Sequence, residues 1–259
     1  MPYSAKNVNL IDADMLHYSV GWSIGDGELE DAYHKVDDFI SWITEQTGCP
    51  DSRLFIAGEG NYRKDIMPEY KANRKGKPKP KHHKAIRDYL INNWDAYVVT
   101  GEEVDDKLGY TQSDDTIICS GDKDLDCIPG KHFNWSKKYV DKGVYELSEV
   151  DADRFFYLQC LSGDPTDGIP GLKRLTGRTA TKKLKEPILS MDNQIDMHDY
   201  VHGLYDGVDW YPSANCLWIR RKPYQIWEDM INELRGRHTS TEEQHHGVVE
   251  ESLGEESEA

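Results

Sequence analysis

The sequence predicts an α/β fold: a central, mostly parallel sheet with flanking helices, followed by a smaller helical region. Four short runs rich in Val and Ile have the length of buried strands, at 7–11, 53–57, 96–100 and 116–120. Segments with helical spacing of apolar residues separate them, and this alternation is typical of parallel sheets with helical crossovers. With 259 residues, 37% of them hydrophobic, the chain can bury a substantial core.

The helical segments follow from the spacing of apolar residues. This spacing predicts helices over 29–48, about 86–94, 103–112 and 149–163. A basic helical stretch is expected over 171–184, and the aromatic-rich segment 192–237 is expected to be mostly helical. The predicted domains are an α/β domain over 1–150, a helical region over 151–237 and an acidic, disordered tail over 238–259.

Charge is distributed unevenly along the chain. The net charge is −16, yet residues 61–87 hold ten Lys and Arg against two acidic residues, a net charge of +8. Lys and Arg neutralise phosphates, and the tyrosines among them offer faces on which unpaired bases stack. This basic segment therefore predicts a nucleic-acid partner. The alternative is a solvated loop, and such a loop can also become ordered around a nucleic-acid strand.

Several classes of protein are excluded at this stage. The sequence contains no run of about 18 apolar residues, which a membrane-spanning helix would need. Its first residues lack the basic-then-apolar layout of a secretory signal. The five cysteines are an odd number without a C-x-x-C pair, which favours reduced, buried thiols and a cytoplasmic location.

Acidic residues follow three of the four predicted strands. They are Asp12 and Asp14 after the first run, Glu103, Asp105 and Asp106 after the third, and Asp122 and Asp124 after the fourth. Because the carboxyl ends of parallel strands meet at one edge of a sheet, these side chains are expected to lie together. Any one of them alone is better explained as a helix cap or turn residue.

A further pair of acids lies in SGDPTDGIPG, residues 162–171. There Asp164 and Asp167 are three residues apart on a bend rich in Gly and Pro. Carboxylates held close repel each other unless one is protonated or a cation lies between them. Hard oxygen donors select Mg²⁺ or Mn²⁺, and so many of them predict more than one ion, as in the two-metal sites of phosphoryl transfer.

Five blocks of the sequence resemble the flap endonuclease/5′→3′ exonuclease family, especially its small bacteriophage members and the exonuclease domain of bacterial DNA polymerase I. In order between residues 7 and 171 they are NLIDADMLHYS, RKDIMPEYKANR, GEEVDD, SGDKDLDCIPG and LSGDPTDGIPG. The resemblance implies a PIN/5′-nuclease-like sheet, a helical arch over the active site at about 61–87, and a helix–hairpin–helix motif that binds DNA. It also implies a monomer that cleaves DNA with a free 5′ end or flap, or an RNA–DNA hybrid.

The resemblance further implies roles for individual residues. Two or more Mg²⁺ ions, which Mn²⁺ can replace, would be bound by Asp12, Glu103, Asp105, Asp106, Asp122, Asp124, Asp164 and Asp167. Lys71 and Arg74, three residues apart on one helix face of the arch, would contact the scissile phosphate. DNA would be bound by Arg63, Lys64, Tyr70, Lys71, Arg74, Lys75, Lys173, Arg174, Arg178 and Lys182.

The chain also departs from the family pattern. Ile56 stands where family members carry an Asp at the end of the second strand, and Glu59 is the candidate to replace it. Asp14 is additional, and Gly168 stands where Asn is usual. The hairpin reads Arg174-Leu175-Thr176 before Gly177. Because Thr would be strained at positive φ, we expect the turn to be centred on Gly177.

Two other functions fit part of the sequence. LIDAD followed by GDKDLD is similar to haloacid-dehalogenase-like phosphatases, in which Asp12 would be the nucleophile. That reading has Leu16 where Thr or Val is required, and it gives no role to the acids at 103–106 and 164–167. The second alternative is a protein that binds DNA junctions but is catalytically weak because Ile56 impairs the metal site.

Overall fold

The computed structural model describes residues 7–236 and confirms the α/β fold. Within these residues the sheet has six strands in the order β3-β2-β1-β4-β5-β6; the first five run parallel and β6 runs antiparallel to β5. The strands are β1 (Val8–Asp12), β2 (Asp51–Ala57), β3 (Tyr97–Val99), β4 (Thr116–Ser120), β5 (Gly130–Asn134) and β6 (Val144–Leu147). The predicted tail at 238–259 lies outside the described residues.

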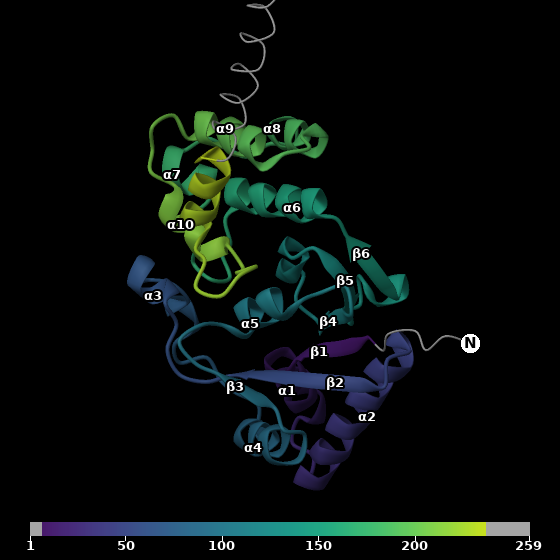
Figure 1. Cartoon of the computed structure of the whole chain (residues 1–259). Coiled ribbons are helices and arrows are strands. Elements are labelled where there is room, and N and C mark those ends of the chain that lie inside the picture. The colour runs from purple at the N-terminus through teal and green to yellow at the C-terminus, as the bar shows by residue number, and fades with distance from the viewer. Residues whose placement is uncertain (1–6, 237–259) are drawn as a thin grey trace, which may run out of the picture.

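Helices cover both faces of this sheet (Figure 1). One face packs against α1 (Ala13–Ile24), α2 (Leu29–Thr47) and α4 (His83–Asn93). The other packs against α5 (Val104–Thr111), α6 (Glu149–Ser162), α9 (Gln194–Tyr205), α10 (Tyr211–Leu217) and a helical segment over 227–236. The short elements are α3 (Arg63–Ile66), α7 (Leu172–Thr176), α8 (Lys182–Lys185), and the 3₁₀ turns η1 (Ala72–Arg74), η2 (Asp124–Cys127), η3 (Val140–Lys142) and η4 (Glu186–Ser190).

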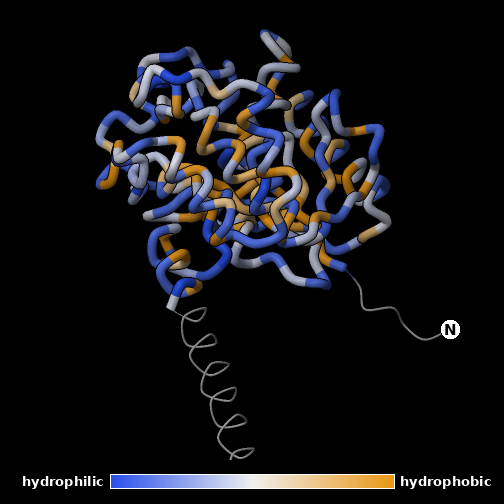
Figure 2. The backbone as a smooth tube through the Cα atoms, turned by 90° about the horizontal axis from the view of Figure 1, so that it is seen from above, coloured by the Kyte–Doolittle hydropathy of each residue, from blue (hydrophilic) through white to orange (hydrophobic). Residues whose placement is uncertain are grey.

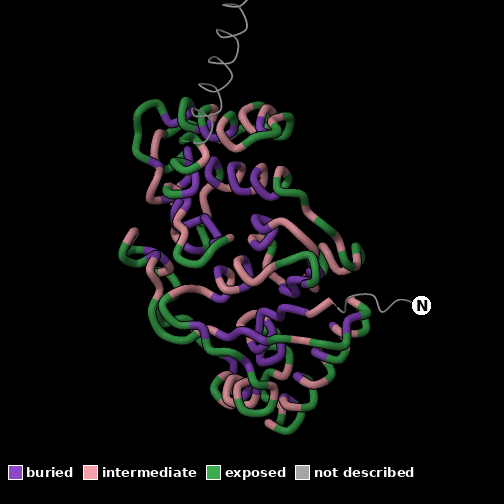
Figure 3. The backbone as a smooth tube through the Cα atoms, viewed as in Figure 1, coloured by how far each residue is buried: buried purple, intermediate pink, exposed green. Residues whose placement is uncertain are grey.

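Alternation along the central strands builds a separate core on each face. In β1, Leu10 packs in the core that contains Phe156 of α6, whereas its neighbour Ile11 packs in the core that contains Ile40 of α2. The strand is apolar on both sides because both faces are covered, as parallel sheets require. Hydrophobic and buried segments accordingly run through the middle of the molecule, with polar, exposed segments around them (Figures 2 and 3).

Some elements differ from the predictions. Helix α1 and strands β5 and β6 are additional, and the stretch 171–184 forms two short helices, α7 and α8, instead of one. The turn after α7 is centred on Gly177, at φ +78°, while Thr176 stays helical. This confirms the expected shift of the turn.

The expectation of buried thiols is met among the described residues. The five cysteines are all buried and free of disulfide bonds. No helix within 7–236 combines the length and the apolar character needed to cross a membrane.

Candidate metal-binding active site

The carboxyl ends of the parallel strands open into a cavity of about 400 Å³. It is lined by seven of the eight carboxylates predicted to bind metal: Asp12, Glu103, Asp105, Asp122, Asp124, Asp164 and Asp167. Asp14 lines it as well, together with Lys71 and Arg74. The fold therefore brings together acids that lie more than 150 residues apart in the sequence, the strand-end acids by the sheet topology and Asp164 and Asp167 by the loop after α6.

Two glycines build the loop that carries Asp164 and Asp167. Gly163 has φ +68°, and a Cβ placed on Gly171 would lie 2.3 Å from the Gly163 nitrogen, so the two backbones touch. The loop between them closes through a pair of backbone hydrogen bonds between Asp164 and Ile169, of 3.0 and 2.8 Å. Only glycine permits this close approach.

Asp12 lies where β1 meets α1. Its carboxylate caps the helix by accepting a hydrogen bond from the Met15 N–H (3.0 Å) and accepts a second from the Ser120 hydroxyl (2.7 Å). Burial, then the charge of Asp14 and more weakly that of Asp122, raise the pKa of Asp12 to about 7. The side chain is therefore held in place by hydrogen bonds, but its ionised form is destabilised by burial and by the neighbouring acids.

Asp105 is the carboxylate with the least support from the protein. Burial, followed by the charges of Asp12, Asp122 and Glu103, holds the pKa of Asp105 well above its ordinary value. Within residues 7–236, no group donates a hydrogen bond to the carboxylate oxygens of Asp105. A partly buried anion surrounded by like charges is stabilised by a cation, so the oxygen donors of this cavity fit a hard divalent ion.

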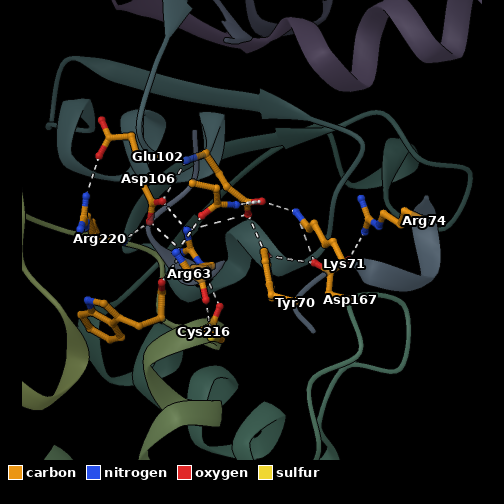
Figure 4. A network of polar contacts seen from close by, with 12 residues as sticks. Arg63, Tyr70, Lys71, Arg74, Glu102, Asp106, Asp167, Cys216 and Arg220 are labelled. Atoms are coloured by element: carbon orange, nitrogen blue, oxygen red, sulfur yellow. Dashed lines mark hydrogen bonds and ion pairs between the residues drawn. The ribbon is translucent and has the colours of Figure 1, made fainter. Parts of the chain in front are cut away.

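Residues of the basic segment line the cavity and contact two of its carboxylates, Glu103 and Asp167 (Figure 4). Lys71 pairs with Glu103 and lies 3.4 Å from the Asp167 Oδ2 atom, while Arg74 pairs with Asp167 Oδ1. The Tyr70 hydroxyl donates to Glu103 (2.9 Å) and to Asp167 (3.3 Å). Burial opposes ionisation of Glu103, but Arg63 and Lys71 outweigh it and lower the pKa of Glu103.

The backbone at Lys71 corrects one prediction. Lys71 and Arg74 do not share a helix face, because Lys71 has a left-handed conformation (φ 57°) and only the three residues of η1 follow it. The Lys71 N–H donates to the Asp167 carbonyl (2.8 Å), which ties this turn to the acidic loop. Both cationic side chains nevertheless reach the cavity.

The carboxylates are not yet arranged around one ion. Within 7–236, no three His, Cys, Asp or Glu side chains stand in positions to hold a metal together. Glu103 and Asp167 are turned toward Lys71 and Arg74, and Asp124 accepts hydrogen bonds from Lys123 and Gln159, each of 2.6 Å. The donor chemistry fits a divalent ion, and binding requires these side chains to exchange their present partners.

Asp106 is the predicted metal-binding residue that does not line the cavity. It is fully buried and makes two hydrogen bonds with Arg63, of 2.5 and 2.8 Å. Asp105 and Asp106 are adjacent on α5 and therefore point in different directions, one into the cavity and one into the core. The structure thus assigns Asp106 and Arg63 to an internal ion pair, in place of the predicted metal and DNA contacts.

The other predicted DNA-binding residues divide by exposure. Tyr70 is only 3% exposed and cannot stack on a base here, so that prediction is corrected: it bridges Glu103 and Asp167. Lysines and arginines on the basic segment and around α7 and α8 are exposed, as DNA contacts require: Lys64, Lys75, Lys173, Arg174, Arg178 and Lys182.

The end of β2 also differs from expectation. Ile56 is fully buried in the core, and Glu59, its candidate replacement, is exposed and does not line the cavity. Sequence reasoning also missed Asn61, whose amide donates to Glu103 (2.8 Å), and Ser120, which supports Asp12. Ser120 is the last residue of β4, and Asn61 lies four residues after the end of β2; this proximity to strand ends was the available signal.

Comparison with known proteins supports the resemblance, although no protein-family model matches the chain. The exonuclease of Escherichia phage T7 is 31% identical over 166 residues, which are 60% of this chain and 54% of the phage protein. DNA polymerase I of Streptococcus pneumoniae is 27% identical over 177 residues, 60% of this chain and 18% of the polymerase. The chain thus spans about half, or less, of the length of these relatives.

The fold has a counterpart among solved structures. The flap endonuclease of bacteriophage T5, solved with DNA and metal ions, superposes with a TM-score of 0.59 over 82% of this chain and 89% of its own, at 17% identity. The shared fold includes the six-stranded sheet and its flanking helices. The chain is thus similar in sequence to an exonuclease and to DNA polymerase I, and similar in fold to a flap endonuclease, as the resemblance to the flap endonuclease/5′→3′ exonuclease family predicts.

Proposed function

We propose that the chain is a metal-dependent 5′-nuclease that hydrolyses phosphodiester bonds at the 5′ end or flap of duplex DNA or of an RNA–DNA hybrid. The observation that carries this proposal is the cavity in which seven carboxylates from four separate segments lie beside Lys71 and Arg74. Carboxylates bind the metal ions of phosphoryl transfer, and cations beside them bind the phosphate. The free, buried thiols agree with the cytoplasm as its location, that of the bacterial host if a phage encodes it.

Mg²⁺ is the proposed physiological ion, with two or more bound and with Mn²⁺ as a substitute. Neither histidine nor cysteine lines the cavity, and oxygen donors alone favour these ions over zinc. When bound, such ions activate water and stabilise the leaving oxygen of an in-line displacement. Asp12 and Asp105, whose pKa values are raised by burial and by neighbouring acids, gain most from a cation.

Lys71 and Arg74 would hold the scissile phosphate. In the present structure they neutralise Glu103 and Asp167. Once those carboxylates have a metal partner, the two cations become available to a phosphate and to the charge that develops on it during cleavage. Tyr70 keeps Glu103 and Asp167 together while this exchange takes place.

The duplex would lie along α7 and α8. Their cations are exposed, and the Arg174 guanidinium donates to the Gly168 carbonyl (3.1 Å), which places this surface beside the loop of Asp164 and Asp167. Such cations contact the phosphate backbone without reading sequence. Terminal nucleotides must unpair to reach the cavity, at a cost of about a few kcal/mol by analogy with flipped bases.

A DNA-junction-binding protein without strong cleavage is the second candidate. It is favoured by the present pairing of the carboxylates. Glu103 and Asp167 form ion pairs with Lys71 and Arg74, and within 7–236 no three side chains are positioned to bind a metal ion together. The two candidates differ in what they do to a bound substrate.

A 5′-labelled flapped, nicked or gapped duplex separates them. With Mg²⁺ or Mn²⁺, we expect short 5′-phosphorylated products, and with a chelator we expect binding without cleavage. A duplex with a 3′ flap is the control and should remain intact. Binding of the 5′-flapped duplex without cleavage at every concentration of either ion would select the second candidate.

Lys71→Ala tests the phosphate-binding role. We expect turnover to fall on the order of 10²–10³-fold, because one charge-stabilising donor is lost, while DNA affinity changes only slightly. The matched control is Lys75→Ala, which removes an exposed cation outside the cavity and should weaken binding without this loss of turnover. Equal losses of binding and turnover in Lys71→Ala would make Lys71 an anchor for the DNA backbone only.

A further inference from the structure

The end of β2 brings no acidic side chain of its own to the cavity. The neighbouring strand β1 ends at Asp12, and Asp122 lies two residues after the end of β4. At the end of β2, Ile56 is buried in the core on the α1 face, and Ala57 and Gly58 line the cavity without a side-chain donor. The carboxylate wall therefore has a gap between the ends of β1 and β3.

Asp14 lies across this gap. Its Oδ1 atom accepts a hydrogen bond from the N–H of Ala57, the last residue of β2, at 3.1 Å. This contact joins the first turn of α1 to the neighbouring strand, 43 residues away in the sequence. The Asp14 side chain lines the cavity together with Asp12 and Asp105. One oxygen is thus fixed by the backbone, which leaves the other available to a ligand.

We propose that Asp14 is a further metal-binding residue, which supplies the carboxylate that the end of β2 lacks. The proposal rests on the proposed function, since it assigns a new residue to the same metal site. The simpler explanation is that Asp14 is a first-turn acid that stabilises the start of α1. That explanation requires neither the contact with Ala57 nor a place in the cavity wall.

Asp14→Asn separates these explanations, because the amide keeps an oxygen for the Ala57 N–H and removes only the charge. The full chain without metal is titrated with Mn²⁺ in the absence of DNA, and bound and free ions are counted by electron paramagnetic resonance. We expect the affinity for Mn²⁺ to fall about tenfold or more. Urea unfolding of the metal-free protein should show no loss of stability beyond that of a surface substitution.

Two variants complete the experiment. Glu59→Gln is the matched control, since it removes an exposed acid just beyond the same strand end, and its Mn²⁺ affinity should equal that of the wild type. Asp122→Asn is the reference for a lost ligand. If it weakens Mn²⁺ binding while Asp14→Asn binds as the wild type does, the role of Asp14 is overturned and the proposed function stands. A wild-type chain that binds no Mn²⁺ overturns both.

Discussion

Asp122→Asn is expected to reduce metal-dependent cleavage of a 5′-flapped duplex on the order of 10³-fold and to leave DNA binding nearly unchanged. Asp122 lines the cavity at the end of β4, close enough to Asp12 and Asp105 for its charge to raise the pKa of both. Removal of that charge should lower the affinity of the cavity for the metal ion. The cationic surfaces proposed to bind DNA lie on other segments and should be unaffected.

Asp122→Asn should have little effect on the stability of the fold. Asp122 Oδ1 accepts a hydrogen bond from the Asp124 N–H (2.9 Å), and the amide oxygen of Asn can accept the same bond. Less repulsion within the cavity should leave the metal-free protein at least as stable as the wild type in urea. Cleavage would be measured as single turnover at saturating Mg²⁺, and DNA binding by fluorescence anisotropy with a chelator present.

Asp126→Asn is the matched control for this experiment. Asp126 lies in the same short segment, does not line the cavity and accepts a hydrogen bond from Tyr145 (2.7 Å), which Asn preserves. Its turnover should stay close to that of the wild type. Wild-type turnover in Asp122→Asn as well would show that the carboxylate is not needed for the reaction, and the metal assignment at the end of β4 would be lost.

The sequence was most informative where burial on both faces left a continuous apolar run. All four predicted strands are present, because residues such as Leu10 and Ile11 serve opposite cores and must both be apolar. Strand β5 was missed because Phe133 is its only large apolar residue. Its neighbouring buried side chains, His132 and Asn134, are polar.

Helix α1 was missed for a related reason. Its buried face has the right spacing, but it is built partly from small or polar residues such as Ala13, His17 and Gly21, so no apolar stripe is visible. At Gly21 the absence of a side chain is required, since a Cβ there would lie 2.7 Å from Pro80. Close packing of this kind depends on a segment about 60 residues away, which a local pattern cannot reveal.

The site could be predicted as a set of acids but not as a set of contacts. Parallel topology alone brings the strand-end acids to one edge of the sheet, so the clustering of Asp12 and Asp122 followed from the order of strands and helices. The distinction between Asp105 and Asp106 did not follow, because it depends on where Arg63 lies in the folded chain. Nor did the contact of Asp14 with Ala57, which depends on the register between β1 and β2.

The Arg63–Asp106 pair joins three parts of the molecule that sequence places far apart. Besides Asp106, Arg63 donates to the carbonyls of Cys216 (2.9 Å) and Trp218 (2.6 Å). Asp106 in turn accepts from the backbone N–H groups of Glu103 (3.2 Å) and Arg220 (3.1 Å). The start of the basic segment, α5 and the end of α10 are thus held by one buried network (Figure 4).

Asp106→Asn is accordingly expected to destabilise the fold by about 3–5 kcal/mol, because it removes the carboxylate that pairs directly with the buried guanidinium and leaves only Glu103, 3.9 Å away, as a counter-charge. This is a large part of the roughly 5–15 kcal/mol that stabilises a typical domain. Urea unfolding of the metal-free protein, followed by tryptophan fluorescence, measures the change. Arg63→Met should reduce the free energy of unfolding less in the Asp106→Asn background than in the wild type. In the wild type it leaves the buried Asp106 carboxylate unpaired, and in the Asp106→Asn background that carboxylate is absent. A stable Asp106→Asn protein with weakened Mn²⁺ binding would instead support the sequence-based prediction that Asp106 binds metal.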